Sequence, residues 1–171
     1  SAASDVYKRQ VNRGISSQTT PQMLVRFRAD VIDLQPKAVV ILAGTNDIAG
    51  NTGPSTVKMI ADNIISMAEL ARQNNILVVI SSVLPVYDYS WKPGLEPAPK
   101  ISKLNKIIKN YALKHGHTYL DYYAALVDDK KGLDEKYTSD GVHPNKEGYK
   151  VMAALAEQAL AKTLDYGRLK K

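Results

Sequence analysis

Two kinds of hydrophobic pattern alternate along most of this chain. Residues 37–44 and 76–83 are nearly continuous apolar runs rich in β-branched side chains. Such runs are typical of parallel strands that are covered on both faces. A short strand is also predicted at residues 118–121, after Gly116, and another at residues 11–15, ending in a glycine turn. The pattern thus predicts four strands separated by longer segments.

The longer segments have helical periodicity, with apolar residues three and four positions apart. Thr20 and Pro21 are expected to open the first of four helices, and Ser55 or Thr56 the second. The last helix is expected from Pro144 to about Leu164. The residues predicted to face inward are Met23, Leu24, Phe27, Val31 and Leu34; Val57, Ile60, Ile64, Met67 and Ala71; Ile101, Leu104, Ile107, Ile108 and Tyr111; and Tyr149, Met152, Leu155, Ala159 and Leu160.

Alternating helices and buried strands predict one three-layer α/β/α domain on a parallel sheet, over residues 11–165. The length of 171 residues suits a single domain with a real core. In such sheets ligands bind beyond the carboxyl ends of the strands. Gly14, the turn at residues 44–47 and a proline-rich loop at residues 84–99 are expected at that edge.

The two ends of the chain change how its charge is interpreted. Residues 1–10 lack periodicity, and residues 5–10 resemble the translation of a sequencing-library adaptor, so we expect this segment to be no part of the fold. The net charge of +6 divides into +1 over residues 1–10, +3 over a basic tail at residues 166–171, and +2 over the body. No basic stripe interleaved with aromatic residues remains, so a nucleic-acid partner is not expected.

Other classes are restricted by what the sequence lacks. The chain has no cysteine. It therefore forms no disulfide and offers no thiolate nucleophile, and its composition fits a cytoplasmic or an exported protein. No apolar run is long enough to span a membrane.

Two short motifs carry candidate chemistry. In Asp140-Gly141-Val142-His143 an acid stands three residues before a histidine, where it can orient the imidazole and stabilise its protonated form. In Gly44-Thr45-Asn46-Asp47 a glycine turn follows a buried strand, and the Asn46 amide can donate a hydrogen bond to a developing oxyanion. A plain strand-to-helix turn would favour the same residue types as the second motif.

Together these motifs resemble those of the SGNH (GDSL-type) hydrolases, in the same order along the chain. The second family block is similar to Asn12-Arg13-Gly14-Ile15-Ser16, the third to Gly44-Thr45-Asn46-Asp47 and the last to Asp140-Gly141-Val142-His143. The resemblance covers residues 11–164 and implies a flavodoxin-like sheet and bacterial relatives. It also implies hydrolysis of a small-molecule or carbohydrate ester through an acyl-enzyme, without metal or cofactor.

The resemblance assigns roles to four residues. His143 would be the general base and Asp140 its orienting acid. The Gly14 N–H and the Asn46 side chain would form the oxyanion hole. Short acyl groups such as acetyl are implied, because the sequence contains no extended apolar lid.

The first family block, Gly-Asp-Ser or Gly-Asn-Ser, has no counterpart in this chain. We therefore expect an N-terminally truncated domain without its nucleophile and without its first strand, and almost no turnover. That strand belongs between the strands at residues 11–15 and 37–44. Its absence predicts an exposed or wrongly paired edge, marginal stability and aggregation.

Three aromatic residues in the loop at residues 84–99, Tyr87, Tyr89 and Trp91, are candidates to stack on a sugar or line an acyl pocket. Covering the end of the sheet is an equally good interpretation. His115 and His117 are best explained as helix-end residues, because no third metal ligand is evident. The alternative to an esterase is a non-catalytic α/β binding module that uses this loop. A nucleotide-binding protein is disfavoured, because no glycine-rich phosphate loop follows a strand.

Overall fold

The computed structural model describes residues 10–169, with side chains through Asp165. Its sheet has three parallel strands in the order β1 (Ala38–Ile41), β2 (Leu77–Ser81) and β3 (Thr118–Leu120). Val39 pairs with Val78, and Val79 pairs with Thr118. Three of the four predicted strands are therefore confirmed.

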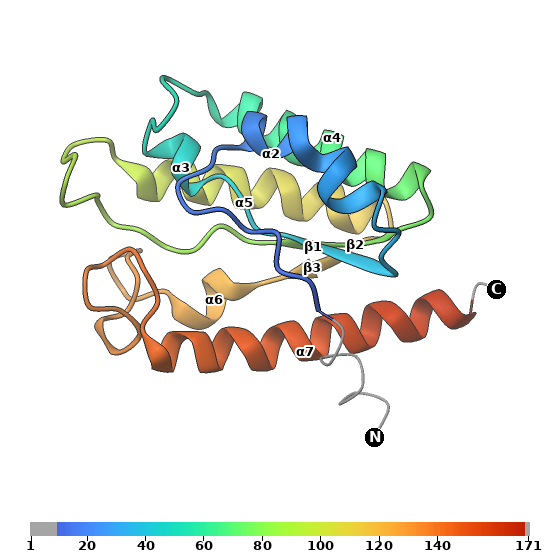
Figure 1. Ribbon diagram of the computed structural model, residues 1–171. Helices are drawn as coiled ribbons and strands as arrows, with labels where there is room; N and C mark the ends of the chain where they lie inside the picture. Colours follow the sequence, from blue (N-terminus) through green and yellow to red (C-terminus); the bar gives the residue numbers. More distant parts are fainter. Residues whose placement is uncertain (1–9, 170–171) are drawn as a thin grey trace.

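Helices cover both faces of this sheet, which confirms the predicted three-layer α/β/α architecture (Figure 1). One layer consists of α2 (Thr20–Phe27) with its π-helical continuation Arg28–Ile32, α3 (Thr45–Ile48), α4 (Val57–Gln73) and α5 (Pro97–Lys114). The other consists of α6 (Tyr122–Leu126) and α7 (Lys146–Leu169), with the 3₁₀ turn Glu135–Tyr137 packed on α7. None of the described helices is long and apolar enough to cross a membrane.

Each layer buries its own apolar cluster against the sheet, and most of the predicted inward faces are confirmed. Leu34 and Tyr149 are exceptions, because they are 47% and 59% exposed. Leu34 lies beyond the last helical residue, Ile32. Tyr149 lies in the first turn of α7, where the helix packs on the turn Glu135–Tyr137 instead of the sheet. The core includes Ile60, Ile64, Met67, Ile101, Leu104 and Ile108 on one face, and Val79, Leu120, Leu126, Met152 and Ala159 on the other.

The helix boundaries mostly follow the capping signals. Thr19, one residue before the predicted cap, forms a capping box with Gln22. Thr56 caps α4 as predicted, by accepting the N–H of Met59 at 3.1 Å. The predicted loop after Gly44 contains the short helix α3. The last helix continues to Leu169, beyond the expected end and into the predicted tail, while the rest of that tail lies outside the described residues, as do residues 1–9 of the adaptor-like segment.

The predicted strand at residues 11–15 is wrong. These residues are exposed and pair with no strand in the described part of the chain. The side chain of Asn12 accepts the Gly14 N–H at 2.8 Å, a local bond that competes with sheet pairing. The exposed edge that we predicted is present at β1, because β1 pairs only with β2 among the described strands. At this edge Val40 is 37% exposed. The marginal stability and the aggregation that we expect from it stay predictions.

Candidate functional site

Asp140 and His143 contact each other in the turn that leads into α7. Asp140 Oδ2 lies 2.7 Å from His143 Nδ1, and Asp140 Oδ1 accepts the backbone N–H groups of Val142 and His143 at 2.9 and 2.8 Å. The Nδ1 contact leaves Nε2 as the free nitrogen of a ring whose side chain is 72% exposed. The pair therefore has the geometry of a carboxylate that orients an accessible base.

Thr138 organises this turn, and the sequence motif did not include it. Its hydroxyl donates to the His143 carbonyl at 2.8 Å, and Thr138 Oγ1 lies 3.2 Å from Asp140 Oδ1. The Thr138 hydroxyl oxygen also accepts the Gly141 N–H at 3.0 Å. A threonine two residues before an aspartate is a common turn signal, which identifies a turn but no function.

We expect the Asp140 carboxyl to stay ionised down to pH values below the ordinary aspartate range. Hydrogen bonds from the His143 backbone and ring, and then from the Val142 N–H, hold the pKa of Asp140 well below its usual value of 3.8. The depressed pKa means that the turn gains stability above the unfolded-state pKa and loses it as pH falls through the folded-state pKa. Carboxyl-carbon NMR should show no Asp140 titration between about pH 5 and pH 3.

His143→Ala is the control for this titration. It removes the ring donor but keeps the two backbone donors, so the Asp140 pKa should rise part of the way towards its ordinary value. A titration midpoint near about 4 in the unchanged chain would contradict the hydrogen bonding described above.

The Gly44–Asp47 turn begins at the carboxyl end of β1 and forms α3. Gly44 has a φ of +118° and is buried. Asp47 is 2% exposed and accepts the Thr20 N–H at 3.0 Å and the Thr20 hydroxyl at 2.6 Å. Burial raises the pKa of Asp47, and the two Thr20 hydrogen bonds oppose that shift. This carboxyl therefore joins the start of α2 to the turn that carries Asn46.

Replacing Asp47 by Ala should destabilise the fold by about 3 kcal/mol, because the buried Thr20 N–H and hydroxyl lose their acceptor. Urea unfolding measures the change. Asp62→Ala is the matched control, because Asp62 pairs with Lys58 on the exposed side of α4 and should cost less than about 0.5 kcal/mol. Equal losses in the two variants would contradict a structural role for Asp47.

Gly14 and Asn46, the candidate oxyanion donors, line one small pocket of about 150 Å³. Leu42, Val83 and Val142 also line it, so it lies at the carboxyl ends of β1 and β2 and beside His143. Both amides already have acceptors. The Gly14 N–H donates to Asn12 Oδ1, and Asn46 Nδ2 donates to the Gln18 carbonyl at 3.0 Å.

The three aromatic side chains of the loop at residues 84–99, two tyrosines and one tryptophan, have different surroundings. Tyr89 is 1% exposed. Its hydroxyl lies 3.0 Å from the Thr45 hydroxyl and donates to the Thr45 carbonyl at 3.0 Å. Its burial fits the covering interpretation and does not fit stacking on a sugar. Trp91 is 56% exposed and stacks beside His143, with 6.3 Å between ring centroids. Tyr87 is 66% exposed.

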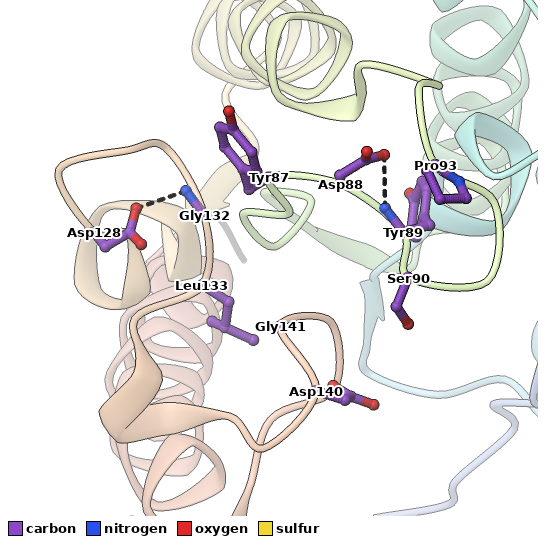
Figure 2. Close-up of a pocket in the computed structure, with 10 residues that line it drawn as sticks. All are labelled: Tyr87, Asp88, Tyr89, Ser90, Pro93, Asp128, Gly132, Leu133, Asp140 and Gly141. Atoms are coloured by element: carbon purple, nitrogen blue, oxygen red, sulfur yellow. Dashed lines mark hydrogen bonds between the residues drawn. The ribbon is translucent and has the colours of Figure 1, made fainter.

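A larger pocket of about 300 Å³ opens between this loop, the turn at residues 128–133 and the Asp140 turn (Figure 2). Tyr87 and Ser90 lie on one side, and Asp128 and Leu133 lie on the other. Because Asp140 lines the pocket and contacts His143, the pocket adjoins the candidate base. Asp128 could not be identified from the sequence, where it has only the pattern of an ordinary turn residue.

His115 and His117 lie away from this site, at the end of α5 and just before β3. Both rings pack near Tyr111, with centroid distances of 4.2 and 5.8 Å. Desolvation lowers the pKa of His117, and the neighbouring His115 adds to that effect. Within residues 10–169 no group of three or more histidine, aspartate or glutamate side chains could hold a metal. The pair therefore has the position of helix-end residues.

The solved structures that this chain resembles include two Bacteroides proteins at 48% identity. One is a candidate acylhydrolase from Bacteroides fragilis NCTC 9343, with a TM-score of 0.87, covering 90% of this chain and 75% of that one. The other is a GDSL-like lipase from Bacteroides thetaiotaomicron VPI-5482, with a TM-score of 0.86, covering 89% of this chain and 75% of that one. An acetylxylan esterase from Geobacillus stearothermophilus, 18% identical with a TM-score of 0.71 over 87% of this chain and 70% of that one, shares the fold.

Sequence comparison points in the same direction. The uncharacterized lipoprotein YqeF of Bacillus subtilis strain 168 is 33% identical over 88 residues, which is 50% of this chain and 36% of that protein. The chain thus matches about a third of that relative's length. The model of the GDSL-like lipase/acylhydrolase family matches residues 2–151, a range that includes both motifs and begins within the adaptor-like segment. The chain therefore belongs to the GDSL-like lipase/acylhydrolase family.

Proposed function

We propose that this chain carries the base, its orienting acid and the oxyanion donors of a serine ester hydrolase. The observation that carries this proposal is the 2.7 Å contact between Asp140 Oδ2 and His143 Nδ1, in a ring that stays open to solvent. Membership of the GDSL-like lipase/acylhydrolase family supports it. The test is acetyl-ester hydrolysis before and after a serine-bearing strand is joined to the chain, with His143→Ala as the control.

In this mechanism His143 Nε2 removes the proton of a serine hydroxyl as its oxygen attacks the ester carbonyl. The carbonyl oxygen becomes an oxyanion, which Asn46 and the Gly14 N–H stabilise. His143 then returns the proton to the leaving alcohol, and water hydrolyses the acyl-enzyme by the same steps. Asp140 keeps the ring in the tautomer that has a proton on Nδ1.

The oxyanion donors need only a small rearrangement for this role. The Asn46 amide has two N–H donors, and Gln18 takes one, so the other can reach a substrate oxygen. The Gly14 N–H must exchange Asn12 Oδ1 for the oxyanion. Gly14 lies in an exposed segment outside the sheet, so this exchange breaks no strand pairing.

The nucleophile is the part that we propose is missing. Among the described residues no serine hydroxyl forms a hydrogen bond with His143. Ser16 and Ser17 follow Gly14 after Ile15, and Ser90 lies in the wall of the larger pocket. We therefore infer that the chain as printed has almost no turnover.

The proposed substrate is a short acyl ester, such as an acetyl group on a carbohydrate. The small pocket beside Asn46 suits a short acyl group, and the exposed rings of Tyr87 and Trp91 suit a sugar. The acetylxylan esterase of similar fold agrees with this substrate class. The alternative function is a non-catalytic module that binds a carbohydrate in the larger pocket, and the same exposed rings favour it.

A further inference from the structure

We propose that the pocket in Figure 2 selects an alcohol that carries an ammonium group, and that the ester's alcohol half is a sugar with a free amine. This inference rests on the proposed ester hydrolysis, because it assigns the leaving-group side of that site. The pocket lies where the alcohol half of the ester would bind, because Asp140 lines the pocket and contacts His143.

The charge of the pocket wall favours a cation. Three carboxyl groups line it, those of Asp88, Asp128 and Asp140, and its ten lining residues include no lysine, arginine or histidine. Lys92, in the same loop, directs its ammonium group to the Ala49 carbonyl at 3.3 Å. An anionic sugar would therefore meet only like charges in the wall, whereas an ammonium group would meet opposite ones.

One carboxylate oxygen in this pocket is available to a ligand. Asp88 uses both oxygens, which accept the Tyr89 and Gly94 N–H groups at 2.8 and 3.0 Å. Asp128 Oδ1 accepts the Lys130 and Gly132 N–H groups at 2.9 and 2.7 Å. Asp128 Oδ2 has no hydrogen-bond donor among the described residues. The backbone thus fixes the Asp128 carboxylate and leaves this oxygen as an acceptor.

The position of Gly132 brings that oxygen close to an aromatic residue. A Cβ atom on Gly132 would lie 3.1 Å from Tyr87 Cβ and 3.3 Å from Asp128 Oδ2, so the Gly132 backbone packs closely against both residues, and both border the same part of the pocket. The Tyr87 side chain is 66% exposed. An aromatic face attracts both the C–H face of a sugar and a nearby ammonium group.

These features together distinguish between classes of alcohol. A sugar ring is needed to use the Tyr87 face, and an ammonium group is needed to use Asp128 Oδ2 as an ion pair. A neutral sugar gains the stacking and hydrogen bonds without the ion pair. A simple alkyl ammonium gains the ion pair without the ring contact. An amino sugar gains both.

The single tryptophan of the chain makes this proposal directly measurable. Trp91 lies beside the site, and the centroid of its ring is 5.3 Å from that of Tyr89 and 6.3 Å from that of His143. Its fluorescence can be titrated at pH 6 with three trisaccharides: glucosamine trimer as the cation, N-acetylglucosamine trimer as the neutral sugar, and galacturonic acid trimer as the anion. We expect the cationic trimer to bind at least about tenfold more tightly than the neutral one, and the anionic trimer to bind least.

Asp128→Asn tests the cause of this preference. The amide keeps an oxygen for the Lys130 and Gly132 N–H groups but removes the charge, so the preference for the cationic trimer should disappear while neutral-trimer binding is kept. Gly132→Ala should weaken both trimers, because the added methyl group would crowd Tyr87 and Asp128 and displace them. Asp62→Asn, on the exposed side of α4, is the charge-matched control and should change nothing.

Equal binding of the cationic and neutral trimers would overturn the proposal, as would a preference that survives Asp128→Asn. This result is independent of the hydrolysis test, because binding needs no nucleophile. If a serine-bearing chimera hydrolyses esters but the chain shows no preference, only this inference fails. If the preference is present but the chimera is inactive, the proposed hydrolysis fails, and the assignment of the pocket to an ester's alcohol half fails with it.

Discussion

Acetyl-ester hydrolysis should stay at background when the chain is assayed as printed, and should rise by up to about a millionfold when a strand ending in Gly-Asp-Ser is joined ahead of Val11. The gain has this size because the loss of a catalytic serine removes the acyl-enzyme route, and leaves only oxyanion stabilisation and binding. The measurement is acetate release from an activated acetyl ester and from an acetylated oligosaccharide.

The physical basis of this expectation is the free edge of β1. Among the described strands β1 pairs only with β2, and the side chains of Val40 and Leu42 are 37% and 41% exposed. An added parallel strand can pair with that edge and end at the side of the sheet where Asn46 lies. Its serine would then enter the pocket that Gly14 and Asn46 share.

The controls separate the added serine from the strand that carries it. A chimera ending in Gly-Asp-Ala should gain stability without activity, and His143→Ala should abolish the activity of the serine chimera. Asp140→Asn should lower it by roughly 10⁴-fold, because the ring loses the partner that fixes its tautomer. Hydrolysis by the unmodified chain that His143→Ala removes would contradict the proposal that the nucleophile is missing.

The parts of the site that were predictable from the sequence are those set by local geometry. Asp140 and His143 are three residues apart, so one turn of chain brings their side chains together almost regardless of the surrounding fold. The strands around Val39 and Val78 were predictable for a similar reason, because continuous β-branched runs fit a pleat that is buried on both faces.

The parts that were not predictable depend on partners far away in the sequence. The segment at residues 11–15 has the composition of a strand, but a strand also needs a neighbour, and β1 does not pair with it. Tyr89 stands between Tyr87 and Trp91 in a polar loop, yet it is buried because its hydroxyl reaches Thr45, 44 residues away. The free oxygen of Asp128 likewise depends on how its turn closes at Gly132.

Gly44→Ala should destabilise the fold by about 3 kcal/mol, the largest loss that we expect from adding a single methyl group. Gly44 has a φ of +118°, and a Cβ atom there would lie 3.0 Å from Leu104 Cδ2 and 3.2 Å from Ile60 Cγ2. Both neighbours belong to the tightly packed core, so they cannot move away without opening a void elsewhere. Urea unfolding measures the loss.

Gly53→Ala separates the two causes of this loss. Gly53 also has a positive φ, of +98°, but a Cβ atom there would meet nothing within 4 Å, so only backbone strain of about 1 kcal/mol is expected. Leu104→Ala tests the remaining part, since it removes the methyl group nearest to the new Cβ atom. Gly44→Ala should therefore cost less in the Leu104→Ala background than in the unchanged chain. Equal costs in both backgrounds would mean that strain, not crowding by Leu104, restricts this position to glycine. Because Gly44 directly precedes the turn that carries Asn46, crowding here would also displace the candidate oxyanion donor.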